Sequence, residues 1–261
     1  MALTASSTLL AEDEPPPCQI ENPAGNSPFL LICDHAGQRI PRRLGTLGVT
    51  EADQQRHIAW DIGAAGVTLK LAATLNATAL LQCYSRLVID CNRPLHSAES
   101  IVTTSERTPI PGNDNLNVDE IAQRQRAIFA PYHAAIHRTL DTRRESGQPT
   151  LLLALHSFTP VYLGQVRPWH IGLLYNRDPR LARALAAALR AEAGLIVGDN
   201  EPYTVDDNTD YSIPEYGERR GLLHVEIEIR QDLIADDAGQ QRWAQRLADL
   251  LPPLVEPLMR N

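Results

Sequence analysis

Two short apolar runs in this 261-residue sequence each lead into a histidine, and this repetition constrains the fold more than any other feature. The run over 29–33 leads to His35, and the run over 151–155 leads to His156. A continuous apolar run of this length is typical of a strand that is buried on both faces of an α/β sheet. Because ligands of such sheets bind outside the carboxyl ends of the strands, we expect both histidines at a binding edge.

Two imidazoles and one carboxylate are suitable ligands for a catalytic zinc ion, which keeps a fourth position open for water. The best carboxylate candidate is Asp61. The apolar spacing predicts a helix over 50–76 and places Asp61 on its buried face. A buried carboxylate needs a compensating partner, and a metal ion, an arginine or a helix N-terminus would each provide one.

A second pair of histidines, His133 and His137, lies four residues apart on a helix predicted over 118–144. This spacing allows metal binding, but Ile136 and Leu140 share the neighbourhood of the pair. We therefore interpret them as packing or surface histidines.

Two further apolar runs, over 87–89 and 171–174, predict strands, and arginines gather beside the predicted strand ends. The planar guanidinium group donates two parallel hydrogen bonds and suits the recognition of a carboxylate. Arginines next to a metal site therefore indicate an anionic substrate. The candidates are Arg86, Arg93, Arg177 and Arg230.

The segment 222–230 alternates apolar and polar side chains and places Glu226 and Glu228 on one face of a predicted strand. A half-exposed strand with a charged outer face would show the same alternation. The segment belongs to the α/β body, however, where both faces of a strand tend to be covered, and a carboxylate on a covered face is a candidate general base. The alternation leaves both interpretations open and does not choose between the two glutamates.

Predicted helices separate the predicted strands along most of the chain. This alternation requires crossover connections and predicts an α/β fold, with a mostly parallel mixed sheet between two layers of helices. The composition marks no interior linker, so residues 18–261 are predicted to form a single domain, preceded by a mobile tail over 1–17. The segment 94–116 is too long for an ordinary connection and is a candidate lid over the active site.

Composition and missing motifs exclude several classes of function. A formal net charge of −8 argues against nucleic acid or an anionic membrane surface as the partner, and no apolar stretch approaches the roughly 20 residues that span a bilayer. The four cysteines show no Cys-x-x-Cys spacing, which favours free thiols in the cytoplasm. Without Gly-x-Ser-x-Gly, Gly-x-Gly-x-x-Gly or Walker sequences, serine-hydrolase, dinucleotide and nucleotide functions lose their usual support. A small-molecule partner remains, and the oligomeric state is left open.

Several stretches together resemble the N-formylglutamate amidohydrolases, in family order from about residue 28 to residue 235. The most specific stretch is Ser-Arg-Leu-Val-Ile-Asp-Cys-Asn-Arg-Pro over 85–94. The resemblance implies a phosphorylase/hydrolase-like α/β/α fold, related in architecture to zinc carboxypeptidases and to the succinylglutamate desuccinylase and aspartoacylase group. The other matching stretches are 34–37 with 40–41, 60–61, 156–157 and 228–234.

The resemblance also implies a Zn²⁺ ion held by His35, Asp61 and His156. Those architectural relatives take their second ligand from a glutamate three residues after the first histidine. This sequence has Gln38 there, so the carboxylate must come from elsewhere, and Asp61 is the best candidate.

The family match assigns the remaining roles. Glu228 is expected to be the general base rather than Glu226, because the match places this glutamate directly before Ile-Arg-Gln. Arg86 is expected to stabilise the oxyanion. Asn92 and Arg93 are expected to bind substrate, because they resemble the Asn-Arg pair that holds a substrate carboxylate in the carboxypeptidase relatives. Arg230 is expected to bind a second carboxylate, and Ser157 is also expected to bind substrate.

The predicted function is therefore the zinc-dependent removal of a small acyl group, formyl before others, from an N-acyl acidic amino acid such as N-formylglutamate. Two alternatives remain. One is a zinc carboxypeptidase that acts on short peptides, although a long lid suits a small ligand better. The other is a non-catalytic protein that has lost its metal and binds an acidic amino acid derivative.

Overall fold

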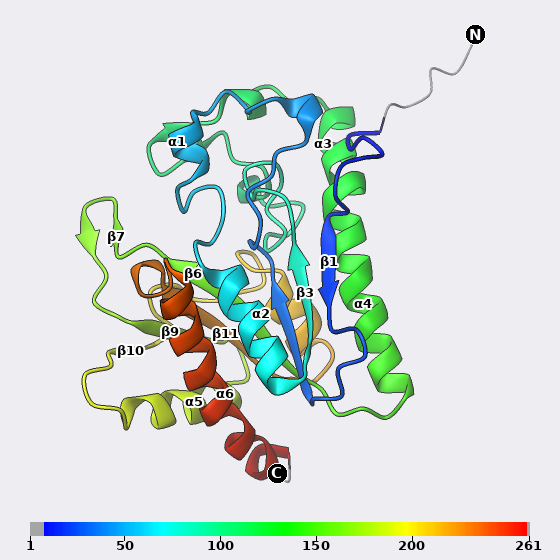
Figure 1. Cartoon of the computed structure of the whole chain (residues 1–261). Helices are drawn as coiled ribbons and strands as arrows, with labels where there is room; N and C mark the ends of the chain where they lie inside the picture. The colour runs from blue at the N-terminus through cyan, green and yellow to red at the C-terminus, as the bar shows by residue number, and fades with distance from the viewer. Residues whose placement is uncertain (1–7, 260–261) are drawn as a thin grey trace.

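Apolar runs form the centre of a seven-stranded sheet in the computed structural model, which describes residues 8–259 (Figure 1). Its strands are β1 (Cys18–Glu21), β2 (Phe29–Cys33), β3 (Thr78–Gln82), β6 (Leu151–Phe158), β9 (Ile171–Leu174), β10 (Val197–Asp199) and β11 (Leu223–Arg230). They lie in the order β1-β3-β2-β6-β11-β9-β10. The four strands from β3 to β11 in this order are parallel, whereas β1 and β9 run antiparallel to β3 and β11. The predicted α/β fold with a mostly parallel mixed sheet is confirmed.

Helices cover both faces of this sheet. On one face are α2 (Ala64–Leu75), α5 (Arg180–Arg190) and α6 (Asp237–Met259), and on the other is α4 (Ala130–Glu145). The remaining helices are α1 (Glu51–Gln54) and α3 (Val118–Arg124), and the π-helical η4 (Gln125–Phe129) joins α3 to α4. Side chains of a strand alternate between the faces. Leu31 and Leu153 therefore pack in the cluster that contains α2, α5 and α6, while Leu30 and Leu152 pack in the cluster that contains α4.

Short elements lie in the connections. The segment 94–116, predicted as a lid, contains the 3₁₀ turns η2 and η3 and the β4–β5 hairpin, and Arg56 at the end of α1 donates to Thr108 of this hairpin at 2.8 Å. The β7–β8 hairpin follows β6 directly (Figure 1). The bounds are η1 (Arg42–Leu44), η2 (Ala98–Ser100), β4 (Thr104–Ser105), β5 (Thr108–Pro109), η3 (Pro111–Asn113), β7 (Val161–Tyr162), β8 (Gln165–Val166), η5 (Ile213–Glu218) and η6 (Gln231–Leu233).

The single helix expected over 50–76 is wrong, because α1 ends at Gln54 and α2 begins only at Ala64. Gly63 precedes α2 with a φ of +81°, and a Cβ at this position would lie 2.2 Å from the carbonyl oxygen of Ile234. Only glycine meets both conditions without strain. Asp61 consequently lies in the turn before α2 and not on a helix face.

The apolar run over 87–89 is fully buried but forms part of a turn rather than a strand. Side chains satisfy its backbone carbonyl groups in place of a neighbouring strand. The guanidinium of Arg124 donates to the carbonyl of Val88 at 2.9 Å, and the amide of Asn113 donates to the carbonyl of Leu87 at 2.9 Å. Apolar character therefore identified the burial of this segment correctly but not its backbone conformation.

Residues 8–17, part of the segment expected to be a mobile tail, contact the body of the protein. Leu9 is buried in the cluster that contains α4. The hydroxyl of Tyr84 donates to the carbonyl of Pro15 at 2.8 Å, and the carboxylate of Glu14 accepts from the backbone of Arg42 at 2.9 Å. These contacts hold the segment on the body, while residues 1–7 lie outside the described residues.

Two predictions from composition can be compared with the structure. All four cysteines are free, as predicted, and three of them are buried. None of the helices within residues 8–259 is both long and apolar enough to cross a membrane.

Gly37 holds the segment after β2 directly against the segment after β3. A Cβ at Gly37 would lie 2.0 Å from the carbonyl oxygen of Cys83, and the bridge between Arg39 and Tyr84 follows at once. We expect Gly37→Ala to lower the free energy of unfolding by about 1–3 kcal/mol, since two backbone segments must separate. Urea denaturation measures this loss. Gly147→Ala is the control, because its Cβ would meet nothing within 4 Å and only its φ of +69° opposes alanine. Equal losses in both variants would contradict the steric argument.

Candidate active site

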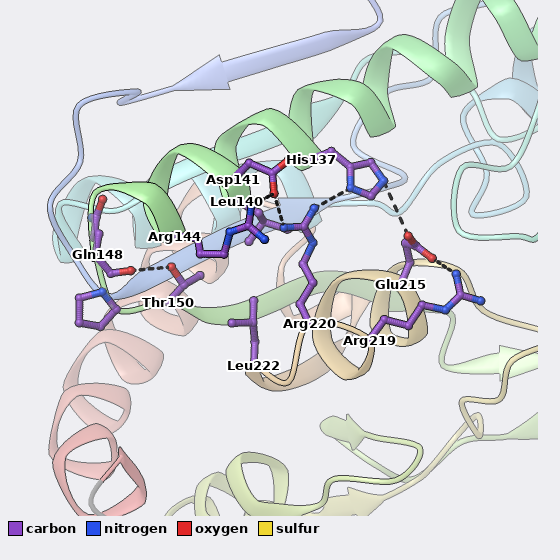
Figure 2. A pocket seen from close by; sticks show the side chains of 12 residues that line it. His137, Leu140, Asp141, Arg144, Gln148, Thr150, Glu215, Arg219, Arg220 and Leu222 are labelled. Carbon is purple, nitrogen blue, oxygen red and sulfur yellow. Dashed lines mark hydrogen bonds and ion pairs between the residues drawn. The ribbon is translucent and has the colours of Figure 1, made fainter.

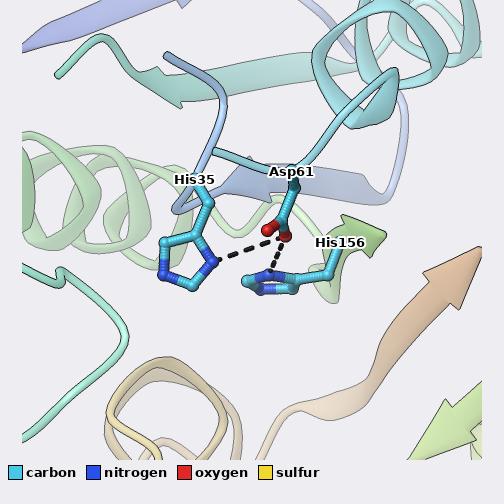
Figure 3. Close-up of side chains that lie close together, drawn as sticks. All are labelled: His35, Asp61 and His156. Carbon is cyan, nitrogen blue, oxygen red and sulfur yellow. Dashed lines mark hydrogen bonds and ion pairs between the residues drawn. The ribbon is translucent and has the colours of Figure 1, made fainter. Parts of the chain in front are cut away.

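The structure brings the side chains of His35, Asp61 and His156 together at the carboxyl edge of β2 and β6 (Figure 3). Oδ2 of Asp61 lies 2.9 Å from Nδ1 of His156 and 3.4 Å from Nδ1 of His35. One ligand atom from each residue lies within 4.8 Å of the others, and all three side chains are buried. The cluster therefore has the donor set and the proximity that a small divalent cation requires.

Hydrogen bonds from both histidine segments fix the turn that contains Asp61. Its backbone N–H donates to the carbonyl of His35 at 2.9 Å, and its Oδ2 accepts from the backbone N–H of Ser157 at 3.2 Å. The hydroxyl of Ser157 donates to the carbonyl of Ile62 at 2.9 Å. Ser157, which we expected to bind substrate, therefore positions Asp61 and its turn through its backbone N–H and its hydroxyl.

Each imidazole has a second carboxylate on its outer nitrogen. Nε2 of His35 lies 2.7 Å from Oδ1 of Asp90, and Nε2 of His156 lies 3.3 Å from Oδ2 of Asp34. Oδ1 of Asp34 accepts from the hydroxyl of Tyr132 at 2.8 Å. When an outer carboxylate holds a proton on Nε2, the lone pair of Nδ1 is free for a metal.

The sequence analysis assigned no role to Asp34, although it directly precedes His35. Asp90 had been expected only to orient an arginine. The adjacency of Asp34 to a candidate ligand was a usable signal, but the contact of Asp34 with His156 joins residues 122 positions apart and depends on the pairing of β2 with β6.

The charges of the cluster favour a cation between its members. Burial by itself would raise the pKa of Asp61, but His35 and His156 outweigh burial and lower it. Burial would also lower the pKa of His156, yet Glu226, Asp34 and Asp61 raise that pKa well above its ordinary value. Burial and Arg86 would lower the pKa of His35, but the carboxylates of Asp90 and Asp61 outweigh them and raise it. Positive charge at this point, as protons or as a metal ion, is therefore stabilised.

Arg86 lies beside the cluster. Its Nε and Nη2 donate to Oδ2 of Asp90 at 3.0 and 2.6 Å, and its Nη1 lies 3.5 Å from Oδ1 of Asp61. Asp90 therefore orients Arg86 through its Oδ2 and His35 through its Oδ1.

Glu228 is the neighbour of His156 in the register of β11 and β6. The strand is buried on both faces over Leu223–Ile229, so the interpretation of a half-exposed strand is wrong. Oε2 of Glu228 is buried and finds no hydrogen-bond partner among residues 8–259. Burial raises the pKa of Glu228 to about 7, with Asp61 acting in the same direction and His156 against it.

Glu226 lies one pleat deeper, beside Ala154 in the same register. Its Oε2 accepts from the amide of Asn92 at 3.5 Å. Burial, Asp210 and Glu228 raise its pKa well above the ordinary value, while His156 opposes them. Glu226 is thus held away from the strand edge, at which Glu228 lies.

Asn92 and Arg93 already have partners within the protein. Oδ1 of Asn92 accepts from the backbone N–H groups of Tyr211 and Ser212 at 3.1 and 2.9 Å. Arg93 donates to the exposed Glu99 at 3.0 Å, and its Nη1 lies 3.7 Å from Asp210. Asn92 therefore holds the loop before η5, while Arg93 faces two carboxylates and the carbonyl of Asn92.

Two arginines of the expected anion site are engaged elsewhere. Nε of Arg230 donates to Asp232 at 2.8 Å, and its Nη1 faces the carbonyl of Pro168 at 3.4 Å. Arg177 pairs with Asp207 and Glu218 at the surface. Arg230, which we expected to hold a second substrate carboxylate, pairs with the residue two positions after it.

A separate pocket of about 660 Å³ lies between α4, η5 and the start of β11 (Figure 2). Nδ1 of His137 faces a guanidinium nitrogen of Arg220 at 2.8 Å, and Arg220 also donates to Asp141 at 2.8 Å. None of the cluster residues lines this pocket. His133 is buried against Tyr216. The pair is a packing and surface pair, as interpreted from the sequence.

Comparisons with known proteins match most of the chain. A family model described as N-formylglutamate amidohydrolase matches residues 27–235, the same stretches on which the sequence resemblance was based. An N-formylglutamate deformylase of Pseudomonas putida is 24% identical over 253 residues, which cover 90% of this chain and 92% of that protein.

Two solved structures share the fold. A gene product of Agrobacterium tumefaciens is 37% identical with a TM-score of 0.92, and the match covers 96% of this chain and 99% of that one. An N-formylglutamate amidohydrolase of Ralstonia eutropha JMP134 is 21% identical with a TM-score of 0.68, and the match covers 94% and 98%.

Proposed function

Because the chain belongs to the N-formylglutamate amidohydrolase family, we propose that it is a zinc-dependent enzyme that removes a formyl or similarly small acyl group from an N-acyl acidic amino acid such as N-formylglutamate. The observation that carries the proposal is the buried cluster of His35, Asp61 and His156, with the unpartnered carboxylate oxygen of Glu228 on the neighbouring strand. The four free cysteines agree with a reducing compartment such as the cytoplasm.

His35, Asp61 and His156 would hold the metal ion through the Nδ1 and Oδ atoms that face one another. A bound Zn²⁺ acts as a Lewis acid and lowers the pKa of water towards neutrality. Asp90, hydrogen-bonded to Nε2 of His35, would keep that nitrogen protonated and fix the orientation of the ring, and the charge of Asp34 at 3.3 Å would favour a proton on Nε2 of His156.

Glu228 acts as the general base and then as the general acid in this proposal. Its carboxylate accepts a proton from the attacking water and delivers it to the amine that leaves. A carboxyl group whose pKa is about 7 suits both steps, since a general base works best near the ambient pH. Arg86, held by Asp90, would stabilise the negative charge that develops on the former carbonyl oxygen.

The central test is a release assay on purified protein over a panel of N-acyl amino acids, short peptides and their amides, with added zinc and with chelator. Zinc-dependent release of formate from N-formylglutamate supports the proposal. Release of C-terminal residues from peptides would instead indicate a carboxypeptidase. Binding of an acidic amino acid without turnover, in protein that contains no metal after zinc addition, would indicate a binding protein.

Arg93 is proposed to bind the α-carboxylate of the substrate. Removing one partner of a buried ion pair costs about 2–5 kcal/mol, so we expect Arg93→Ala to lower kcat/KM by roughly 30- to 4,000-fold. Arg93→Lys keeps the charge but loses the fork and should fall between alanine and the wild type. Kinetics with N-formylglutamate and its α-amide measure both effects, with zinc content as a check.

The control for Arg93 is Glu99→Gln. The carboxylate of Glu99 is 62% exposed, and such a surface pair contributes about 0–1 kcal/mol, so this variant should keep its activity. If the wild type hydrolysed the α-amide as fast as the acid, the role of Arg93 would be wrong.

A further inference from the structure

Arg167 is a buried guanidinium with no carboxylate partner among residues 8–259. Its side chain lies between two tyrosine rings, 4.6 Å from the centre of Tyr162 and 4.7 Å from that of Tyr203. Nη1 donates to the hydroxyl of Tyr203 at 2.8 Å. Arg167 is only 9% exposed. Within the described part of the chain it forms no ion pair, whereas Arg86, Arg93 and Arg230 each face a carboxylate.

The position of Arg167 relates it to the metal cluster. The guanidinium carbon lies 6.0 Å from the ring centre of Phe158, which is two residues beyond His156 on β6 and therefore on the same face of the sheet. Two residues of a strand span roughly 7 Å. The guanidinium of Arg167 therefore lies beside the last residue of β6, two residues beyond His156 on the same face.

Tyr203 connects this arginine with the proposed catalytic groups. Burial and then the charge of Glu228 raise the pKa of the Tyr203 hydroxyl to about 12, while Arg167 and Arg86 act against them. The hydroxyl that accepts from Arg167 therefore lies in the fields of both Glu228 and Arg86.

A buried cation without a counter-ion is costly, and two aromatic faces offset only part of that cost. Nη1 donates to Tyr203, and the other guanidinium nitrogens of Arg167 donate to no group within residues 8–259, so they remain able to bind a carboxylate. We propose that Arg167 binds the side-chain carboxylate of the acidic amino acid substrate, a role that rests on the proposed function.

The test compares N-formyl-L-glutamate with N-formyl-L-glutamine, which has the same shape and a neutral side chain. Arg167→Met keeps an unbranched stem and removes the charge. We expect it to lower kcat/KM for the glutamate substrate by roughly 10- to 100-fold, mainly through KM, with little change for the glutamine substrate. Arg167→Lys keeps the positive charge and should restore part of the preference for the glutamate substrate over the glutamine substrate. Arg246→Met is the matched control, because Arg246 also stacks on an aromatic ring, Trp243 at 4.7 Å, but pairs with Glu192 on the far helices.

Calorimetric binding of L-glutamate and L-glutamine gives a readout that needs no turnover. The wild type should bind L-glutamate more tightly, and Arg167→Met should remove that preference. Equal losses for both ligands in Arg167→Met, or no preference in the wild type, would overturn the role of Arg167 while leaving hydrolysis intact. If no N-acyl amino acid is hydrolysed but the preference and its loss are observed, the proposed function fails and Arg167 remains the carboxylate site.

Discussion

Replacing His35 or His156 with alanine is expected to remove both bound zinc and hydrolysis. Each variant deletes one of two imidazoles and leaves Asp61 with a single histidine, so the remaining donors are too few for a tightly bound catalytic ion. The loss should be complete within the detection limit of the assay. Metal content after zinc addition and dialysis, measured beside turnover, tests this expectation. Asp61→Ala should weaken metal binding as well.

The control for the histidine variants is His137→Ala. His137 contacts Arg220 in the pocket beside α4, and none of the residues that line this pocket belongs to the cluster. The variant should keep its zinc and its turnover. Stoichiometric metal in both His35→Ala and His156→Ala would show that the metal, if one binds, binds elsewhere.

Glu228→Gln is expected to keep zinc and to lose turnover by about 10²- to 10⁴-fold, the usual contribution of a general base. The amide has nearly the shape of the carboxyl group but cannot accept the proton of the attacking water. Oε2 of Glu228 has no hydrogen-bond partner within residues 8–259, so the substitution disrupts no observed hydrogen bond of that oxygen. Single-turnover rates with N-formylglutamate, with zinc content as the check, measure the effect.

Glu226→Gln is the matched control on the same face of β11. Glu226 lies one pleat deeper, and its contact with Asn92 places it in the packing beneath the cluster. We expect this variant to keep most of its turnover. A larger loss in Glu226→Gln than in Glu228→Gln would show that the deeper glutamate is the base.

Local sequence patterns predicted the strands well where both faces are buried. The runs over 29–33 and 171–174 are β2 and β9, and the alternating segment is β11. Such runs are informative because burial on both faces acts on every residue of the strand. The same pattern failed over 87–89, where Arg124 and Asn113 satisfy the backbone instead of a neighbouring strand. Apolar character reports burial, and the backbone partner is a matter of tertiary structure.

The candidate site likewise has a part that the sequence predicted and a part that only the tertiary structure shows. The sequence alone determined the class of the fold, the family, and the placement of His35 and His156 at the carboxyl ends of strands, because these follow from contiguous residues. The place of Asp61 was inferred from a helix that does not exist, and only the turn before α2 brings its carboxylate to the imidazoles.

Only the tertiary structure decided which charged groups remain free to act. Arg230 pairs with Asp232, and Arg167 lies beside two tyrosines with no carboxylate partner within residues 8–259. The uncharged amide of Asn92 is likewise used by the loop before η5. A sequence shows that a charged residue is present, but the availability of its charge depends on every group that packing brings within a few ångströms. Those neighbours lie far away along the chain, so residue patterns determined where the chemistry is located, and three-dimensional packing decided which side chains can perform it.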